Sequence, residues 1–319
     1  MVLLTLSLAE HALKFYALPP SCTVRLINIS ENITYEIITT EGQRFALRIH
    51  RPHYHSKAAI ASELAWLIDL RQNEIVITPK PVVGFDGQLI QDVSGRHVVL
   101  FEWEMGIEPT IHQNLEGPFE ILGEQTARMH RHAKQWQRPN SFERFTWDFE
   151  TSLGERDPHW GRWRDGLGVD AAHAALFGRA VNLIGKRLGH YGKHENRFGL
   201  IHADLRMANL LVDGSTVKVI DFDDCGFGWF MYDAVTPVSF YEHAPQVPAL
   251  LDAWKIGYRR VADLTKEDEN EIATLMMLRR LLLVAWIGSH SETDLAKSMG
   301  VDYTHGTAAL CENYLKEFG

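Results

Sequence analysis

The sequence has few cysteines and no long hydrophobic run. Its three cysteines stand at positions 22, 225 and 311, and none forms a Cys-x-x-Cys pair. This spacing excludes a disulfide scaffold and a cysteine-rich zinc site, and it predicts a reducing compartment. The most apolar run, Leu281–Ile287, is far shorter than the roughly 20 residues that span a bilayer. The opening Met1–Leu4 has no cationic flank, so we expect a cytoplasmic protein with no signal peptide.

An excess of positive charge is also missing. With 41 acidic and 32 basic side chains, the formal net charge is −9. This balance argues against a nucleic-acid partner, which normally meets a basic surface. It fits a site that attracts a cationic substrate, and it fits an ordinary acidic cytosolic protein equally well. The 319 residues, 45% of them hydrophobic, are enough to build two packed lobes.

The first part of the chain is predicted to be rich in strands, and the rest mainly helical. A helix is expected over Lys57–Arg71, because its apolar residues recur at helical spacing. Glycines and prolines make Met105–Pro118 the clearest linker. The predicted strands are Thr23–Ile29, Ile33–Thr39, Gln43–His50, Gln88–Asp92 and His97–Glu104. The later predicted helices are Phe119–Trp136, Ala171–Leu188, Leu250–Val261 and Ile272–Ile287, the last apolar nearly all round and therefore buried.

One ordered set of polar residues carries the chemistry. It consists of His202, Asp204, Asn209, Asp221–Asp224 and Tyr232–Asp233. Short apolar runs, Leu210–Val212 and Val217–Ile220, flank a turn and predict a hairpin that brings Asn209 and Asp221 to its open end. Phosphoryl transfer from ATP needs one carboxylate to orient the acceptor hydroxyl, and an amide with a second carboxylate to hold magnesium.

This set resembles the catalytic core of the aminoglycoside-phosphotransferase family, the small-molecule branch of the protein-kinase-like fold. Choline kinases, type II homoserine kinases and bacterial stress-response Ser/Thr kinases are its relatives. The resemblance implies an α+β, two-lobed fold with a β-rich lobe over 1–104, a linker over 105–118 and a helical lobe over 119–319. It also implies ATP-dependent transfer, with Mg²⁺, of the γ-phosphoryl group to a hydroxyl of a small, amine-bearing molecule such as an aminoglycoside, an amino alcohol or homoserine.

The resemblance assigns roles to the residues of the larger lobe. Asp204 is the expected catalytic base, and Asn209 and Asp221 are the expected magnesium ligands. His202 and Asp233 support the loop that carries the base.

Three other charged residues keep more than one interpretation. Arg206 either faces the γ-phosphate, where it would stabilise developing charge, or forms a surface salt bridge. Asp223 and Asp224 either reach a second metal or the substrate amine, or bond the loop backbone.

In the smaller lobe, the resemblance places Arg48 where the family usually has a Lys that grips the α- and β-phosphates. Glu63 falls on the apolar stripe of its helix, and because an unpaired buried charge is costly, we expect it to pair with Arg48. The turn Ser30–Asn32 lacks glycine, so Asn32 and nearby N–H groups either cover the phosphates or form a plain hairpin. The expected adenine hinge is Phe101, Glu102, Trp103 and Glu104.

Histidines and tryptophans receive simpler interpretations. We expect His50, His53, His55, His130 and His132 to be exposed histidines rather than metal ligands. Trp147, Trp160 and Trp163 are expected to pack the larger lobe or to line part of the acceptor pocket.

Three rival functions remain open. The segment between Asp221 and Tyr232 is short and has no Ala-Pro-Glu, which favours a small molecule over a docked peptide, but stress-response protein Ser/Thr kinases share this feature. The missing glycines and Arg48 leave room for a nucleotide-binding pseudokinase scaffold. A metal-dependent phosphoesterase built on His202, Asp204 and Asp221 would need further histidine ligands.

Overall fold

The computed structural model describes residues 2–29 and 32–319, which form two compact units. The first unit comprises Met1–Gly106, Gln137–Arg144 and Lys218–Asp223, and the second comprises Ile107–Trp136, Phe145–Val217 and Asp224–Gly319. Two late segments, 137–144 and 218–223, therefore belong to the first unit, although their sequence lies among the predicted helices of the larger lobe.

An antiparallel sheet organises the first unit. Its strand order is β1-β2-β3-β5-β4, with β1 at Cys22–Ile29, β2 at Ile33–Thr39, β3 at Arg44–Ile49, β4 at Gln91–Val93 and β5 at Arg96–Glu102. Two helices accompany it, α1 at Val2–Leu13 and α2 at Lys57–Gln72. The predicted strands and α2 are present, and β4 starts three residues later than Gln88. Helix α1 was not predicted from the sequence.

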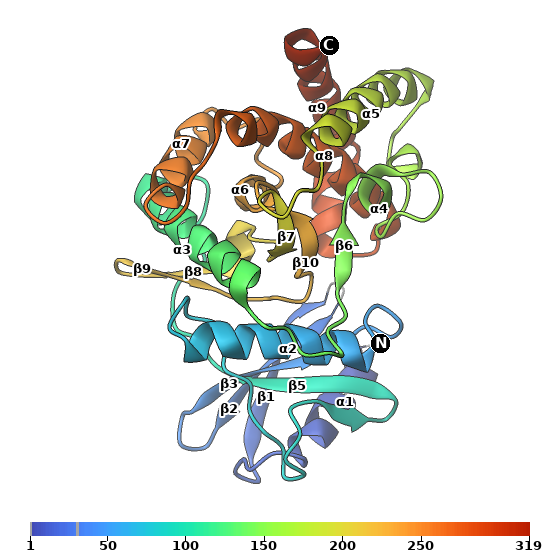
Figure 1. The fold of residues 1–319 in the computed structure, drawn as a ribbon. Helices are drawn as coiled ribbons and strands as arrows, with labels where there is room; N and C mark the ends of the chain where they lie inside the picture. Colours follow the sequence, from blue (N-terminus) through green and yellow to red (C-terminus); the bar gives the residue numbers. More distant parts are fainter. Residues whose placement is uncertain (1, 30–31) are drawn as a thin grey trace. The chain divides into compact units, whose positions relative to one another are not determined.

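The two faces of this sheet carry different side chains, because successive residues of a strand point to opposite faces. Ile37, Leu47 and Leu100 lie on the face that forms a core with Ala9 and Ala12 of α1. Arg48 and Val99 are register partners on the opposite face. Helix α2 runs along the sheet, as Figure 1 shows. The alternation therefore directs Arg48 away from the apolar core around α1.

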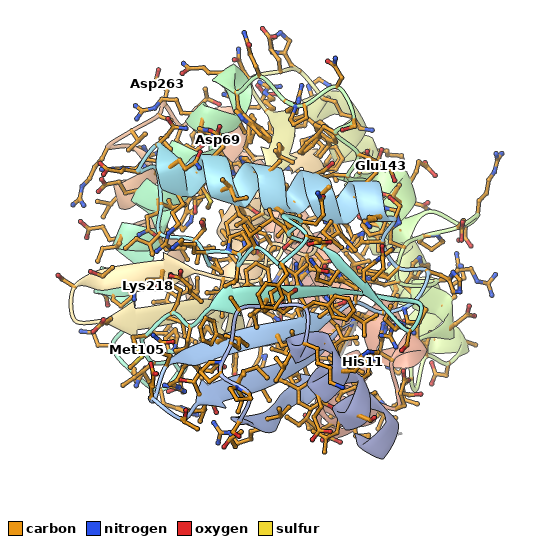
Figure 2. The ribbon with its side chains drawn as sticks, turned by 90° about the horizontal axis from the view of Figure 1, so that it is seen from below. His11, Asp69, Met105, Glu143, Lys218 and Asp263 are labelled. Atoms are coloured by element: carbon orange, nitrogen blue, oxygen red, sulfur yellow. The ribbon has the colours of Figure 1, made fainter. Side chains whose placement is uncertain are left out.

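Helix α2 is fixed at its start by polar contacts. The Ser56 hydroxyl caps it by accepting from the Ala59 N–H, as a serine at this position commonly does. Glu143, in the late segment 137–144, donates its N–H to the Ser62 hydroxyl at 2.9 Å. Its carboxylate accepts from the Ser56 hydroxyl, also at 2.9 Å. In Figure 2, Glu143 lies near the N-terminal end of α2, and Asp69 toward the other end.

The second unit is mainly helical around a small mixed sheet. The sheet has the order β6-β10-β7, and β8 and β9 form a separate pair. The strands are β6 (Phe145–Trp147), β7 (Phe198–Ile201), β8 (Leu210–Asp213), β9 (Thr216–Val219) and β10 (Gly226–Trp229). The helices are α3 (Glu116–Gln135), α4 (Phe149–Leu153), α5 (Ala171–Tyr191), α6 (Tyr232–Val235), α7 (Val247–Tyr258), α8 (Lys266–Ser289) and α9 (Asp294–Phe318). The division between the units passes through β9.

Helices α3 and α7 approach each other closely at two glycines. A Cβ on Gly123 would lie 1.9 Å from the Trp254 carbonyl oxygen, and one on Gly257 would lie 1.7 Å from that of Glu120. Any side chain at either position would push the helices apart. Glycine is therefore required by packing here rather than by backbone conformation.

Helix α8 forms the centre of the second unit, as its apolar sequence predicts. It packs against α4, α5, α6 and α9. By length and composition it would be able to cross a membrane, but 78% of its most apolar 18-residue window is buried inside the protein. Such burial is typical of the core helix of a soluble protein. The helix α9 that packs on it, bent at Gly300, was not predicted from the sequence.

Candidate active site

The loop after β7 holds its backbone in an uncommon conformation. Ala203 has a φ of 68°, in the left-handed region that residues with a side chain seldom adopt. The buried Asp233 carboxylate accepts the N–H of Ala203 at 2.8 Å and that of His202 at 3.0 Å. These two bonds hold the loop so that Asp204, the next residue, follows in a fixed position.

A buried histidine stands behind this anchor. His130 of α3 lies with Nε2 3.1 Å from the Asp233 carboxylate and Nδ1 3.1 Å from the Tyr258 hydroxyl. Burial lowers the pKa of His130 below its ordinary value, although Asp233 opposes the shift. The expectation that His130 is exposed is therefore wrong. Helical periodicity did not reveal that Asp233 and Tyr258 would supply polar partners.

The Asp204 carboxylate is surrounded by donors from its own unit. Its Oδ1 lies 2.5 Å from Nη2 of Arg279, while Oδ2 accepts from the Asn209 amide at 2.8 Å and from Nε of Arg206 at 3.3 Å. Burial raises the pKa of Asp204, but the charges of Arg279 and Arg206 outweigh it, so the pKa lies below its ordinary value. Asp204 is thus a charged, fully oriented carboxylate.

Asn209 is fixed by the same loop. It ends the short helix Met207–Asn209, and its amide nitrogen also donates to the Asp204 backbone carbonyl at 2.8 Å. Because the nitrogen is used in this way, the amide oxygen is the atom that would bind a cation. Oxygen donors of this kind suit Mg²⁺.

Arg279 of α8 is a site residue that was not predicted from the sequence. It is 2% exposed, and besides Asp204 it donates from Nε to the Ser239 hydroxyl at 3.0 Å and from Nη1 to the Tyr232 hydroxyl at 3.3 Å. The neighbouring Arg280 is equally buried and pairs with Glu242 at 2.7 Å. Two adjacent arginines in a helix predicted to be buried were the available signal, because buried cations need anionic partners.

In the first unit, the predicted pair of Arg48 and Glu63 is present. One guanidinium nitrogen, Nη2, lies 2.7 Å from both carboxylate oxygens, and both side chains are buried. The other, Nη1, lies 3.4 Å from Asp221 and 3.9 Å from Asp223. Glu63 therefore orients an arginine whose second nitrogen faces two further carboxylates.

Asp223 is buried and contacts several polar side chains of the first unit. It accepts from the Asn32 amide at 2.8 Å, and the His50 and His55 rings approach it to 3.5 Å. Burial raises the pKa of Asp223, but these rings and the Arg48 charge shift it well below the usual value.

The prediction that the three histidines after β3 are exposed is therefore wrong for two of them. His50 and His55 are buried beside Asp223, whereas His53 is exposed. Asp223 lies far along the chain from both rings, so local sequence gave no sign of this partner.

Asp221 differs from Asp223 in exposure. Its side chain is 43% exposed, against 7% for Asp223, and its own φ of 60° turns the backbone sharply between strand β9 and Asp223. An exposed carboxylate is more accessible to a hydrated cation than a buried one. Asn209 belongs to the other unit, so the sharing of one ion by Asn209 and Asp221 stays a prediction.

Comparison with known proteins decides the family. Residues 23–264 match the phosphotransferase enzyme family. The chain belongs to this family. The solved structure of a microcompartment-associated aminopropanol kinase is 43% identical, with 98% of both chains covered and a TM-score of 0.91. Both the predicted family and the two-lobed α+β kinase-like fold are thereby confirmed, as is the phosphotransferase class at the level of the family.

Two amicoumacin kinases are also similar to this chain, one in sequence and one in fold. The one from Bacillus subtilis (strain 168) is 29% identical over 215 residues, which are 66% of this chain and 60% of that protein, so the match spans less than two thirds of the relative. A solved amicoumacin kinase in complex with AMP-PNP, Ca²⁺ and Ami is 22% identical, with 98% of this chain and 93% of that chain covered and a TM-score of 0.77.

The segment that would form the adenine hinge of this phosphotransferase already uses two of its N–H groups. The Glu102 N–H donates to the Lys80 carbonyl at 2.8 Å, and the Trp103 N–H to that of Arg44 at 3.1 Å. Glu104 pairs with Arg71 at 2.8 Å, and the Phe101 ring lies 5.1 Å from the Arg48 guanidinium. A purine would therefore use other backbone groups of this segment.

Asn32 is engaged in a similar way. Its amide oxygen accepts from the Arg51 N–H at 3.1 Å, while its nitrogen donates to Asp223. Ser30 and Glu31, the rest of the predicted phosphate-covering turn, lie outside the described residues. Any contribution of Asn32 to phosphate binding would come from its backbone.

The tryptophans of the second unit pack its interior, as predicted. Trp147, Trp160 and Trp163 are all buried, and the rings of Trp147 and Trp160 lie 5.2 Å apart in an edge-on arrangement. The Arg279 guanidinium lies 5.2 Å from the Trp160 ring. The cluster therefore reaches the residue that pairs with Asp204.

Proposed function

We propose that the chain transfers the γ-phosphoryl group of ATP to the hydroxyl of a short amino alcohol. The observation that carries this proposal is the 43% identity, over nearly the whole of both chains, to the aminopropanol kinase structure. A match of that extent includes the helices of the second unit as well as the common catalytic motif. The net charge of −9 is compatible with a cationic acceptor.

The residues take the following proposed roles. Asp204 orients the acceptor hydroxyl and receives its proton as the bond to phosphorus forms. Its lowered pKa keeps it ionised at neutral pH, so orientation is its main contribution before transfer. Arg206, whose Nε lies 3.3 Å from Asp204, would stabilise charge on the transferred group.

A nucleotide and a divalent cation complete this site. The Asn209 amide oxygen and the exposed Asp221 carboxylate would hold Mg²⁺, which would neutralise the polyphosphate. Arg48, oriented by Glu63, would bind the α- and β-phosphates through Nη1. Asp223 contacts Asn32 and the two buried histidines, and these contacts would fix the backbone next to Asp221.

The test is an ATP-consumption screen over 1-amino-2-propanol, ethanolamine, choline, homoserine, hydroxylysine, an aminoglycoside and simple sugars. We expect the short amino alcohols to give the highest kcat/KM, with the phosphate ester identified by ³¹P NMR. Asp204→Asn serves as the inactive control. A preference for aminoglycosides or sugars would overturn the choice of acceptor.

A parallel incubation with radiolabelled ATP and mixed proteins addresses the protein-kinase alternative. Label in proteins, with none in the small molecules, would favour that function instead. ATP binding without turnover of any acceptor would favour a pseudokinase.

A further inference from the structure

We infer that Arg279 is a positioning residue for phosphoryl transfer and acts by fixing the Asp204 carboxylate. This inference rests on the proposed function, because it assigns a role to a residue that acts through the proposed base. Arg279 Nη2 lies 2.5 Å from Asp204 Oδ1, and both groups are buried.

Three contacts hold the guanidinium itself. Nη2 faces Asp204, Nη1 donates to Tyr232 at the start of α6, and Nε donates to the Ser239 hydroxyl. A planar guanidinium fixed at three of its corners has one orientation. Its partner carboxylate therefore has a defined direction for Oδ1.

The opposite oxygen of Asp204 then has a fixed place as well. Oδ2 faces the Asn209 amide and Arg206 Nε. Arg206 is more exposed than Arg279, so Oδ2 lies on the more exposed side of the carboxylate. Without Arg279, the carboxylate would lose its closest cation and would be drawn toward Arg206. A displacement of about 1 Å in such a group can lower turnover about a hundredfold.

Arg280 provides a matched comparison. It is adjacent in α8, equally buried at 2% exposure, and also bonded at three points, to Glu242, Thr307 and the Tyr303 carbonyl. None of these partners has a role in the proposed chemistry. A substitution there should disturb folding to a similar extent but should leave Asp204 in place.

The experiment compares Arg279→Lys with Arg280→Lys, since lysine keeps the charge but loses the fork. Transfer to 1-amino-2-propanol is measured by coupled assay, and transfer to water in the absence of acceptor by phosphate release. We expect Arg279→Lys to lower kcat about ten- to a hundredfold with the KM for ATP nearly unchanged. Arg280→Lys should keep kcat within about twofold. Thermal melts and Mg·ATP binding stoichiometry give the folded fraction of each variant.

A double-variant cycle separates positioning from a structural role. If Arg279 acts through Asp204, then adding Arg279→Lys to Asp204→Asn should lower kcat little further, because the oriented carboxylate is already lost. Losses that multiply in the double variant would overturn the inference. So would an Arg279→Lys protein whose folded fraction turns over like wild type.

The proposed acceptor can fail separately. If wild type transfers to water or to another acceptor but not to 1-amino-2-propanol, the acceptor is wrong, and the same cycle read on the active reaction still decides the role of Arg279. A folded wild type that binds ATP and transfers phosphate to nothing would overturn both.

Discussion

Each unit contains a buried arginine that pairs with a carboxylate, but the residue that orients its partner differs between the two pairs. In the first unit, Glu63 is fully buried and orients Arg48, whose second nitrogen faces the exposed Asp221. In the second unit, the arginine is the buried support, and Arg279 orients the carboxylate of Asp204. In the proposed reaction, the first unit therefore supplies the cation that binds phosphate, and the second supplies the anion that orients the hydroxyl. An arginine–carboxylate pair can therefore orient either a cation or an anion, depending on which of the two side chains is fixed by its other contacts.

The largest test of this comparison removes the presented anion. Asp204→Asn should lower kcat by about two to four powers of ten, the usual scale for loss of a general base, and should leave ATP affinity nearly unchanged. The measurement is steady-state turnover of 1-amino-2-propanol together with calorimetric titration of ATP.

Wild-type turnover by Asp204→Asn would remove Asp204 from the reaction. A loss of ATP affinity equal to the loss of kcat would mean that the presented anion instead helps to bind nucleotide. Either outcome would break the comparison of the two units.

The second test removes the exposed carboxylate beside Arg48. Asp221→Ala should abolish the dependence of nucleotide affinity on magnesium, because the main carboxylate ligand is lost. Calorimetry of ATP with Mg²⁺ and with excess EDTA measures this directly, and wild type titrated with EDTA is the control for the metal-free value. Unchanged Mg·ATP affinity in Asp221→Ala would exclude Asp221 from the metal site.

The contrast between Arg48 and Arg279 also explains what the sequence can predict. Arg48 and Glu63 are 15 residues apart, on a strand and the helix that follows, and Glu63 lies on an apolar stripe. Local periodicity therefore exposes the need for a partner. Arg279 is 75 residues from Asp204. Local sequence shows only its neighbours in α8, so it does not identify the carboxylate that pairs with Arg279.

Other errors have the same physical origin. The Asn32–Asp223 bond joins residues 191 positions apart. His50 and His55 are buried beside the same Asp223, although their local sequence looks like an exposed turn. The segment 137–144 lies within the range predicted for the helical lobe, yet it belongs to the first unit, where Arg144 donates to the Ala59 carbonyl at 3.0 Å. Motif and periodicity predicted the fold and the Arg48–Glu63 pair. The long-range polar partners required the structure.

The third test measures the pair in the first unit. If Glu63 orients Arg48 for phosphate, then Glu63→Gln and Arg48→Met should each weaken ATP binding, and the double variant should cost little more than either alone. Dissociation constants of the four proteins give the coupling, which we expect to be about 1 kcal/mol or more, as for residues in contact. Strict additivity would mean that the ion pair does not act in nucleotide binding, and a pseudokinase would then gain support.

The smallest expected effect concerns the histidine behind the second unit's loop. The pKa of His130 is lower in the folded chain than its ordinary value of about 6.5, because the ring is buried. As the pH falls, the unfolded chain therefore binds a proton on this ring before the folded chain does. The contribution of His130 to the free energy of unfolding is complete above about pH 6.5 and is lost as the pH falls. From pH 7 to pH 6 this single group should therefore lower the free energy of unfolding, by less than the limit of about 1.4 kcal/mol for one proton over one pH unit. His130→Gln keeps a donor for Asp233 but cannot titrate, so its free energy of unfolding should fall less over that interval. Urea unfolding at the two pH values measures both slopes, and equal slopes would show that His130 binds protons alike in the folded and unfolded chains.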